Sequence, residues 1–234
     1  MRARNRFTCP SLGSTPTAVA RYPRHVLISD ERRMLFVHIP KTGGASVEQL
    51  LREMCPDARS VGKQRHARLR RILAQHPELA GYWSFGFVRN PWARMVSWYS
   101  MIETWDRRWG PSSGRPQEGQ WGSTRDGNPL WRTVAAYADF EEFILRGTAE
   151  VDRLAMPQVD YLVDGEQRAD FIGRTENLAA DMATVQRELG IEVTEIPRRN
   201  TTSHGSYRDY YSPAARDRIG EVYAKDVEAF GYDF

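Results

Sequence analysis

A short apolar segment that runs directly into a glycine turn is the feature that most constrains how this chain folds. Residues 34–39 read Met-Leu-Phe-Val-His-Ile, which is typical of a buried strand in a parallel sheet. The run stops at Pro40, and Gly43 and Gly44 follow shortly after it. From Ser46 onward the apolar residues have helical spacing. A strand, a turn and a helix in this order predict an α/β fold.

Further segments repeat the pattern. Residues 83–88 form a second apolar run, and Asn90 and Pro91 behind it are a suitable N-cap and first helical residue. A third buried strand is predicted over 169–172, and residues 26–28 indicate a short edge strand. We therefore expect a central parallel sheet flanked by helices. Helices are predicted over residues 66–74, 140–145 and 176–189, from Pro91 and from Pro213.

The length of 234 residues and the hydrophobic content of 41% fit one domain with a substantial core. We place this single domain at residues 23–234 and expect residues 1–22 to be a flexible tail. Residues 105–133 are rich in glycine, serine, proline, arginine and tryptophan and lack periodicity, so we expect a substrate or lid loop there.

Composition restricts the cellular setting and the partners. The net charge of +3 is a mild excess that does not indicate nucleic-acid binding. No apolar run approaches the roughly 20 residues that span a bilayer, and Cys9 and Cys55 do not form a CxxC pair. We therefore expect a cytoplasmic protein of bacterial type without a transmembrane segment. The arginine-rich start of the chain leaves an organelle transit peptide as the alternative.

The turn between the first predicted strand and its helix has the chemistry of an anion site. Its glycines permit a tight turn, and free amides at a helix N-terminus favour a phosphate or a sulfate ester. Lys41 adds a positive charge, and Thr42 and Ser46 add hydroxyl donors. A standard P-loop places its Lys and Ser/Thr after the second glycine, whereas here Lys41 and Thr42 precede both glycines. The alternative is an ordinary strand-to-helix turn with an exposed lysine.

A second basic position follows the next strand. Arg89 lies at the carboxyl end of the predicted 83–88 strand, where open α/β sheets bind ligands, and Ser97 follows two turns into the helix. A nucleotide kinase would often need an aspartate there for magnesium, whereas a guanidinium grips a phosphate directly. The pattern favours a metal-free donor with two separate anionic groups. A surface arginine paired with a carboxylate is the alternative.

Both segments resemble those of a known family. Residues 36–46, Phe-Val-His-Ile-Pro-Lys-Thr-Gly-Gly-Ala-Ser, are similar to the 5'-phosphosulfate loop of the carbohydrate-type sulfotransferases, which include the Golgi heparan and chondroitin enzymes and bacterial relatives. Residues 87–97, Phe-Val-Arg-Asn-Pro-Trp-Ala-Arg-Met-Val-Ser, resemble their 3'-phosphate segment. Residues 171–178 and 207–211 also match the family's pattern, and the resemblance extends over residues 26–232.

The resemblance implies a P-loop-like α/β fold. It also implies an enzyme that moves a sulfuryl group from 3'-phosphoadenosine 5'-phosphosulfate (PAPS) to an acceptor hydroxyl on a carbohydrate or glycoconjugate, without a metal. It assigns the 3'-phosphate to Arg89 and Ser97, with Arg174 and Tyr207 as further donor-binding residues. Relatives often carry threonine at the position of Ala45, whose backbone amide is still available. The residues that would hold the 5'-phosphosulfate are Lys41, Thr42, Gly43, Gly44, Ala45 and Ser46.

Sulfuryl transfer needs a base for the acceptor hydroxyl and stabilisation of the leaving phosphate. Lys41 and the amides of the turn can stabilise the leaving group. Histidine suits the role of base because its pKa is near neutrality, and the family carries its base in a similar interval after the loop, so we assign His66. Glu48, on the helix after the turn, is the reserve candidate, and His38 in the predicted strand is expected to be structural.

Two regions are expected to contact the acceptor, namely the basic run over 63–71 and the tryptophan-rich loop over 105–133. A solvated helix face explains the basic run equally well. Two other functions stay open. A nucleotide kinase would need magnesium and the standard order of the motif, and a non-catalytic nucleotide-binding module would bind the desulfated nucleotide without turnover.

Overall fold

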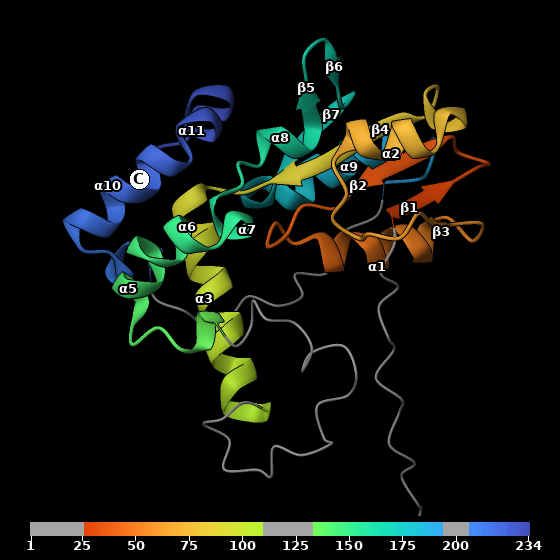
Figure 1. The fold of residues 1–234 in the computed structure, drawn as a ribbon. Coiled ribbons are helices and arrows are strands. Elements are labelled where there is room, and N and C mark those ends of the chain that lie inside the picture. The colour runs from red at the N-terminus through yellow and green to blue at the C-terminus, as the bar shows by residue number, and fades with distance from the viewer. Residues whose placement is uncertain (1–25, 110–132, 194–205) are drawn as a thin grey trace, which may run out of the picture.

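A five-stranded sheet forms the centre of the computed structural model, which describes residues 26–109, 133–193 and 206–234 (Figure 1). The strands of this sheet are β1 (Val26–Ser29), β2 (Met34–Val37), β3 (Arg59–Val61), β4 (Trp83–Val88) and β7 (Phe171–Arg174). Their order is β3-β1-β2-β4-β7, and β2, β4 and β7 run parallel, as predicted. A separate hairpin pairs β5 (Val163–Asp164) with β6 (Gln167–Arg168).

The sheet is mixed rather than wholly parallel, which corrects the prediction. β1 pairs antiparallel with β2 on one side and with β3 on the other. Only residues 30–33 separate β1 from β2, and a connection this short joins antiparallel strands, because parallel neighbours need a long crossover. β1 is consequently an inner strand, and β3 occupies the edge that residues 26–28 were expected to form.

Helices cover both faces of the sheet, and a second group of helices lies beyond the carboxyl end of β4 (Figure 1). Within the described ranges, no helix combines the length and the apolar character needed to cross a bilayer. The helices are α1 (Gly44–Met54), α2 (Leu69–Gln75), α3 (Pro91–Trp109), α5 (Phe140–Leu145), α6 (Gly147–Glu150), α7 (Asp152–Ala155), α8 (Val159–Leu162), α9 (Leu178–Glu188), α10 (Pro213–Val222) and α11 (Ala224–Phe230). Short 3₁₀ helices are η1 (Pro77–Leu79), η3 (Thr175–Asn177) and η4 (Tyr207–Tyr210).

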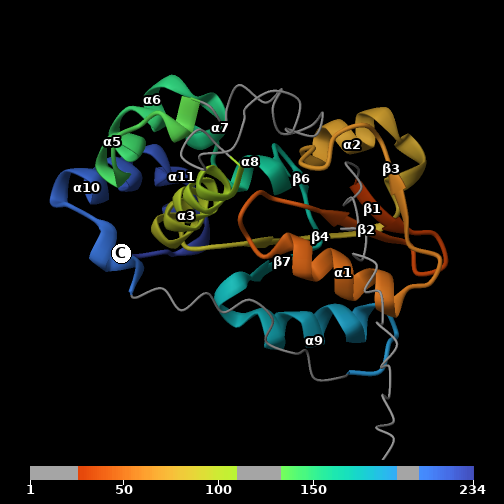
Figure 2. The ribbon, with the colours of Figure 1, turned by 90° about the horizontal axis from the view of Figure 1, so that it is seen from below.

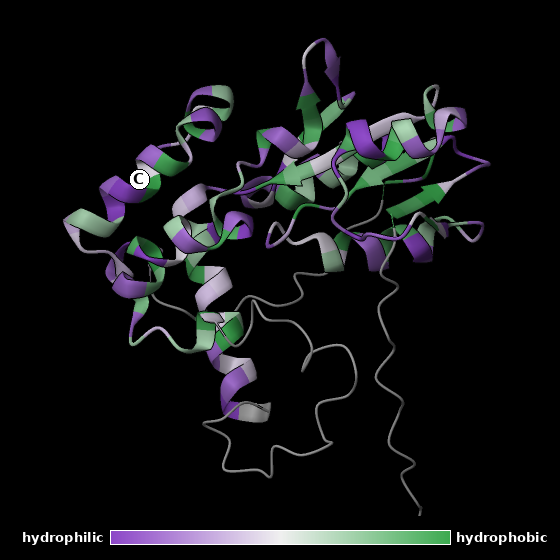
Figure 3. Ribbon diagram, in the orientation of Figure 1, coloured by the Kyte–Doolittle hydropathy of each residue, from purple (hydrophilic) through white to green (hydrophobic). Residues whose placement is uncertain are grey.

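Alternate residues of the strands point into two separate apolar cores. Met34 and Phe36 of β2 belong to the core that α1 and α9 cover, whereas Leu35 and Val37 belong to the core that includes α2, α3 and α8. Figure 2 shows α1 and α9 together on one face of the sheet and α2 on the other. β1 and β2 are strongly hydrophobic in Figure 3, as strands buried on both faces must be.

Helix α3 begins as the sequence predicts. Oδ1 of Asn90 accepts hydrogen bonds from the backbone amides of Trp92 at 3.0 Å and Ala93 at 3.2 Å, so Asn90 is the N-cap. Ser212 likewise caps α10, because its hydroxyl accepts from the amide of Ala215 at 3.2 Å. Both predicted helix starts are confirmed.

Helix α3 ends later than expected, which corrects the start of the predicted loop. Trp98, Ile102 and Trp105 are buried at helical spacing, so the packing keeps the chain helical through residue 105. Residues 110–132 of that loop and the predicted tail over residues 1–22 lie outside the described residues.

Other boundaries differ by a few residues. β7 begins at Phe171 instead of residue 169, α2 begins at Leu69 instead of residue 66, and η3 precedes α9. The last predicted helix is divided into α10 and α11 at Tyr223, whose buried hydroxyl donates to the carbonyl of Leu154.

Candidate functional site

The turn between β2 and α1 has the backbone of an anion-binding loop. Gly43 has a φ of 75°, in the left-handed region that favours glycine. A Cβ on Gly44 would lie 2.2 Å from Cδ2 of His38, so the buried imidazole leaves room only for glycine. The backbone amides of Gly44 and Ala45 find no acceptor within the described residues. This helix start therefore presents free donors to a ligand.

Two threonines hold the turn in place. Thr42 is buried and its hydroxyl donates to the carbonyl of Ile39 at 3.0 Å, so this hydroxyl closes the turn. Thr175, directly after β7, shares its hydroxyl proton between the carbonyl oxygens of Thr42 at 2.9 Å and Val88 at 3.0 Å. The turn is thereby tied to the end of β4. Sequence reasoning gave Thr175 no role, although it lies in the third matching segment.

Lys41 and Arg89, predicted to bind opposite ends of one ligand, lie close together. Burial and the charge of Arg89 lower the pKa of Lys41 to about 8. The ammonium of Lys41 donates to the sulfur of Met101 at 3.1 Å. Burial also lowers the pKa of Arg89, against the opposing influence of Glu176. Since neither cation forms an ion pair within the described residues, the pair is suited to an anionic ligand.

Ser46, Ser97 and Tyr207 are three further residues of the predicted site. Ser46 is half-buried in the first turn of α1, and Ser97 is half-buried two turns along α3. The hydroxyl of Tyr207 accepts a hydrogen bond from Nδ2 of Asn90 at 3.5 Å, which places it beside the residue that follows Arg89. Ser46 and Ser97 therefore lie within the two predicted anion-binding segments, and Tyr207 contacts the second of them.

Arg174 is directed elsewhere. It ends β7, beside the end of β4, but its guanidinium donates to the carbonyl of Phe230 and lies 5.0 Å from the ring centroid of Tyr232. The side chain is thus committed to the C-terminal segment, while its backbone is at the carboxyl edge of the sheet.

Glu48, the reserve candidate for the base, is buried in a cluster of basic residues. It is 2% exposed and accepts hydrogen bonds from Arg65 at 2.8 Å and Arg52 at 3.2 Å. Burial raises the pKa of Glu48, but hydrogen bonding with His38 and the charge of Arg65 outweigh it, so the pKa lies below its ordinary value. The carboxylate is therefore ionised, inaccessible and fully engaged. It orients Arg65, which in turn donates to Nδ1 of His38 at 3.0 Å.

His66 lies beside His38, with the ring centroids 4.7 Å apart in an edge-to-face arrangement. Nδ1 of His66 is 2.9 Å from the carbonyl oxygen of His38, so Nδ1 carries the proton and Nε2 has the free lone pair. Burial and the neighbouring His38 lower the pKa of His66 to about 3. The imidazole is therefore neutral, in the tautomer that a general base at Nε2 requires.

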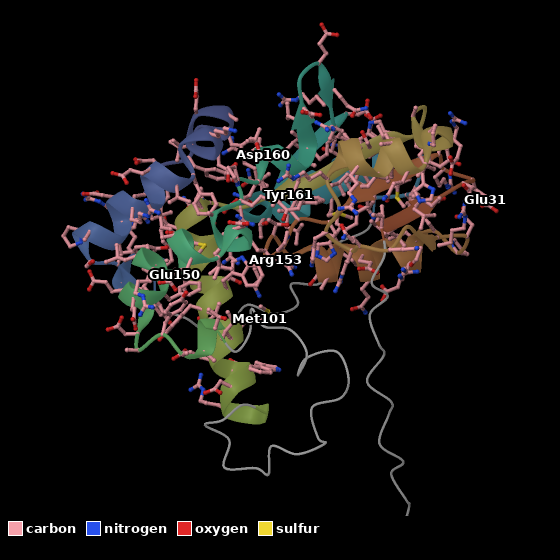
Figure 4. All side chains as sticks on the ribbon, viewed as in Figure 1. Glu31, Met101, Glu150, Arg153, Asp160 and Tyr161 are labelled. Carbon is pink, nitrogen blue, oxygen red and sulfur yellow. The ribbon has the colours of Figure 1, made fainter. Side chains whose placement is uncertain are left out.

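Two arginines to which the sequence assigned no role complete the surroundings. Arg94 is fully buried on α3, and its Nε donates to the carbonyl of Pro40 at 3.0 Å, which anchors the turn from the opposite side. Its position among buried neighbours on α3 is the signal that could have found it. The charge of Arg153 lowers the pKa of His66, so the two lie close together. Arg153 is placed between the sheet and the group of helices around α3 (Figure 4).

Several known proteins are similar to this chain in sequence. An uncharacterized protein of Archaeoglobus fulgidus is 30% identical over 129 residues, which cover 55% of this chain and 84% of that protein. Carbohydrate sulfotransferase 14 of Danio rerio is 23% identical over 213 residues, or 84% of this chain and 54% of that protein. Carbohydrate sulfotransferase 10 of Xenopus laevis is 24% identical over 258 aligned positions, covering 92% of this chain and 70% of that protein.

No solved structure matches the chain significantly. The sequence pattern of the Sulfotransferase family, in contrast, matches residues 24–233. Because this match spans nearly the whole length and includes both predicted anion-binding segments, the chain belongs to the sulfotransferase family.

Proposed function

We propose that this chain transfers the sulfuryl group of PAPS to a hydroxyl of a carbohydrate or glycoconjugate. The observation that carries the proposal is the pairing of Lys41 and Arg89 behind adjacent parallel strands, near enough for one charge to lower the pKa of the other. Placing two half-buried cations side by side costs free energy, because they repel each other and are partly removed from water, and a bound anion offsets this cost. A donor with a 5'-phosphosulfate and a 3'-phosphate supplies one anionic group for each.

The turn fits the 5'-phosphosulfate end of such a donor. The amides of Gly44 and Ala45 are free, and the space that a Cβ of Gly44 would need is filled by His38. Lys41 adjoins these amides and is placed to stabilise the negative charge that develops on the leaving 5'-phosphate. Arg89 and Ser97 then take the 3'-phosphate, and no metal is assigned to either end.

His66 is the proposed general base. As the acceptor oxygen bonds to sulfur and the bond from sulfur to the 5'-phosphate oxygen breaks, Nε2 of His66 takes the hydroxyl proton. The hydrogen bond from Nδ1 to the carbonyl of His38 keeps Nε2 available throughout. A pKa of about 3 makes a weak base near neutrality, but the negative charges of a bound donor raise it. We therefore expect His66 to become an effective base only in the donor complex.

The acceptor class comes from the relatives and from the residues around His66. Two relatives are named carbohydrate sulfotransferases, and we extend that class to this chain. Arg153, whose guanidinium carbon lies 5.7 Å from the ring centroid of the buried Trp98, offers a cationic group near the base. Its N–H groups can donate hydrogen bonds to the hydroxyls of a sugar.

The test is transfer of labelled sulfate from PAPS to a panel of oligosaccharides, with calorimetry of 3'-phosphoadenosine 5'-phosphate (PAP). We expect sulfated product and PAP binding in the wild type, and loss of both in Arg89→Ala. Arg187→Ala, which removes an exposed arginine of α9, is the matched control and should behave as wild type. PAP binding without product on any acceptor would favour a non-catalytic module. Magnesium-dependent ATP binding without PAP binding would favour a kinase.

A further inference from the structure

A buried glutamine takes over the hydrogen bonding of the backbone where β4 leaves the sheet. Val88 is the last residue of β4 that pairs with β7, and Arg89 follows it. Oε1 of Gln158 accepts from the amide of Arg89 at 2.9 Å, and Nε2 donates to the carbonyl of Arg89 at 2.7 Å. A carboxamide can accept and donate at once, so Gln158 replaces a neighbouring strand at this position.

Asp226 of α11 fixes the orientation of that carboxamide. Its Oδ2 accepts from the backbone amide of Gln158 at 2.9 Å and from Nε2 at 3.1 Å, and its Oδ1 accepts from Val159 at 2.9 Å. Gln158 and Asp226 are both fully buried, so water does not compete for these bonds. A flipped carboxamide would place Oε1 against the carboxylate and Nε2 against an N–H group. Only one orientation therefore satisfies every partner.

The next residue is held in the same way from another element. The amide of Asn90 donates to Oε1 of Glu176 at 2.7 Å. The backbone of both residues is thus fixed by side chains, whereas the guanidinium of Arg89 has no hydrogen-bond partner within the described residues. A rigid backbone that presents an uncommitted cation is the arrangement expected of a preorganised binding residue.

We propose that Gln158, held by Asp226, is a positioning residue for Arg89 and sets how strongly this chain prefers nucleotides that carry a 3'-phosphate. The inference rests on the proposed function, because it concerns the nucleotide that Arg89 binds. A glutamine with a merely structural role would affect folding, but not the preference between two nucleotides that differ only in the 3'-phosphate.

The test compares the dissociation constants of PAP and adenosine 5'-phosphate by calorimetry. Gln158→Leu is expected to reduce the preference for PAP about tenfold or more, mainly by weakening PAP binding. Gln186→Leu is the matched control, since Gln186 is also fully buried and hydrogen-bonds through Nε2, to the sulfur of Met54 at 3.3 Å. This control should lower the stability but leave the preference within about twofold of wild type.

The outcomes separate this inference from the proposed function. A wild-type protein that does not prefer PAP to adenosine 5'-phosphate would contradict the proposed function itself. A wild-type preference that Arg89→Ala removes and Gln158→Leu keeps would overturn the positioning role alone. Asp226→Asn, which replaces one acceptor oxygen by a donor, serves if Gln158→Leu does not fold. It should reduce the preference in the same direction, and an unchanged preference there would also overturn the role.

Discussion

Replacing Lys41 by methionine is expected to stabilise the free protein while removing its affinity for the donor. The ammonium is half-buried beside α3, where burial and the charge of Arg89 lower its pKa from the ordinary 10.5 to about 8. The unfolded chain therefore holds this proton more tightly than the native protein does. Methionine is similar in length, carries no charge and can pack against the sulfur of Met101, which now accepts the hydrogen bond of Lys41.

The fall of the pKa from 10.5 to about 8 corresponds to a ceiling of about 3 kcal/mol. Because the native pKa is the lower one, this penalty is complete below about pH 8 and vanishes as the pH rises through 10.5. Partial solvation and the lost hydrogen bond to Met101 reduce the gain to about 1–2 kcal/mol near neutrality. The left-handed backbone of residue 41, with a φ of 70°, carries the same conformational penalty for lysine and for methionine. This penalty therefore cancels when the two proteins are compared.

The assay is urea unfolding of both proteins at about pH 7 and about pH 10, together with calorimetry of PAP. Lys41→Met should raise the free energy of unfolding at the lower pH, show a smaller gain at the higher pH, and bind no PAP. Lys63→Met, at an exposed position, should change neither quantity. A Lys41→Met protein that is less stable near neutrality, or equally stabilised at both pH values, would refute the reasoning.

Three other outcomes are expected. His66→Ala should lower turnover by about 10²–10⁴-fold and leave PAP affinity within about twofold, and near-normal turnover would exclude His66 as the base. Gly44→Ala should cost about 1–3 kcal/mol of stability and weaken PAP binding, because its Cβ would lie 2.2 Å from the ring of His38. Adding His38→Ala should recover part of the stability, and a double variant without such recovery would contradict the steric argument. Thr175→Val should cost about 1 kcal/mol by urea unfolding and weaken PAP binding, and unchanged PAP binding would show that the tie does not support the site.

The parts of the fold that were predictable depend on local sequence. The apolar run at 34–39 and that at 83–88 give β2 and β4, and Asn90 and Pro91 mark the start of α3. Arg89 could be placed at the carboxyl end of its strand because that placement needs only the strand itself. The proximity of Lys41 and Arg89 follows from the parallel pairing of β2 and β4.

The parts that were not predictable depend on contacts between distant segments. Whether Thr42 faces a ligand or closes the turn depends on a carbonyl three residues earlier, and no pattern in the sequence signals that choice. The sequence predicts Glu48 to be an accessible acid on a helix, and only the structure shows that Arg65 and Arg52 donate hydrogen bonds to its carboxylate. Gln158 lies 69 positions after the residue whose backbone it holds, so only the folded chain reveals it.

The shared proton of Thr175 has a consequence for which nucleotides this fold can accept. The turn and the end of β4 cannot move apart without breaking one of its two bonds, at 2.9 and 3.0 Å. A ligand that reaches from Lys41 to Arg89 must therefore match a separation that the folded protein fixes before the ligand binds. Isomers with the second phosphate on a different ribose oxygen would meet one cation and miss the other. Discrimination among such isomers would then originate in a hydroxyl hidden behind the binding surface.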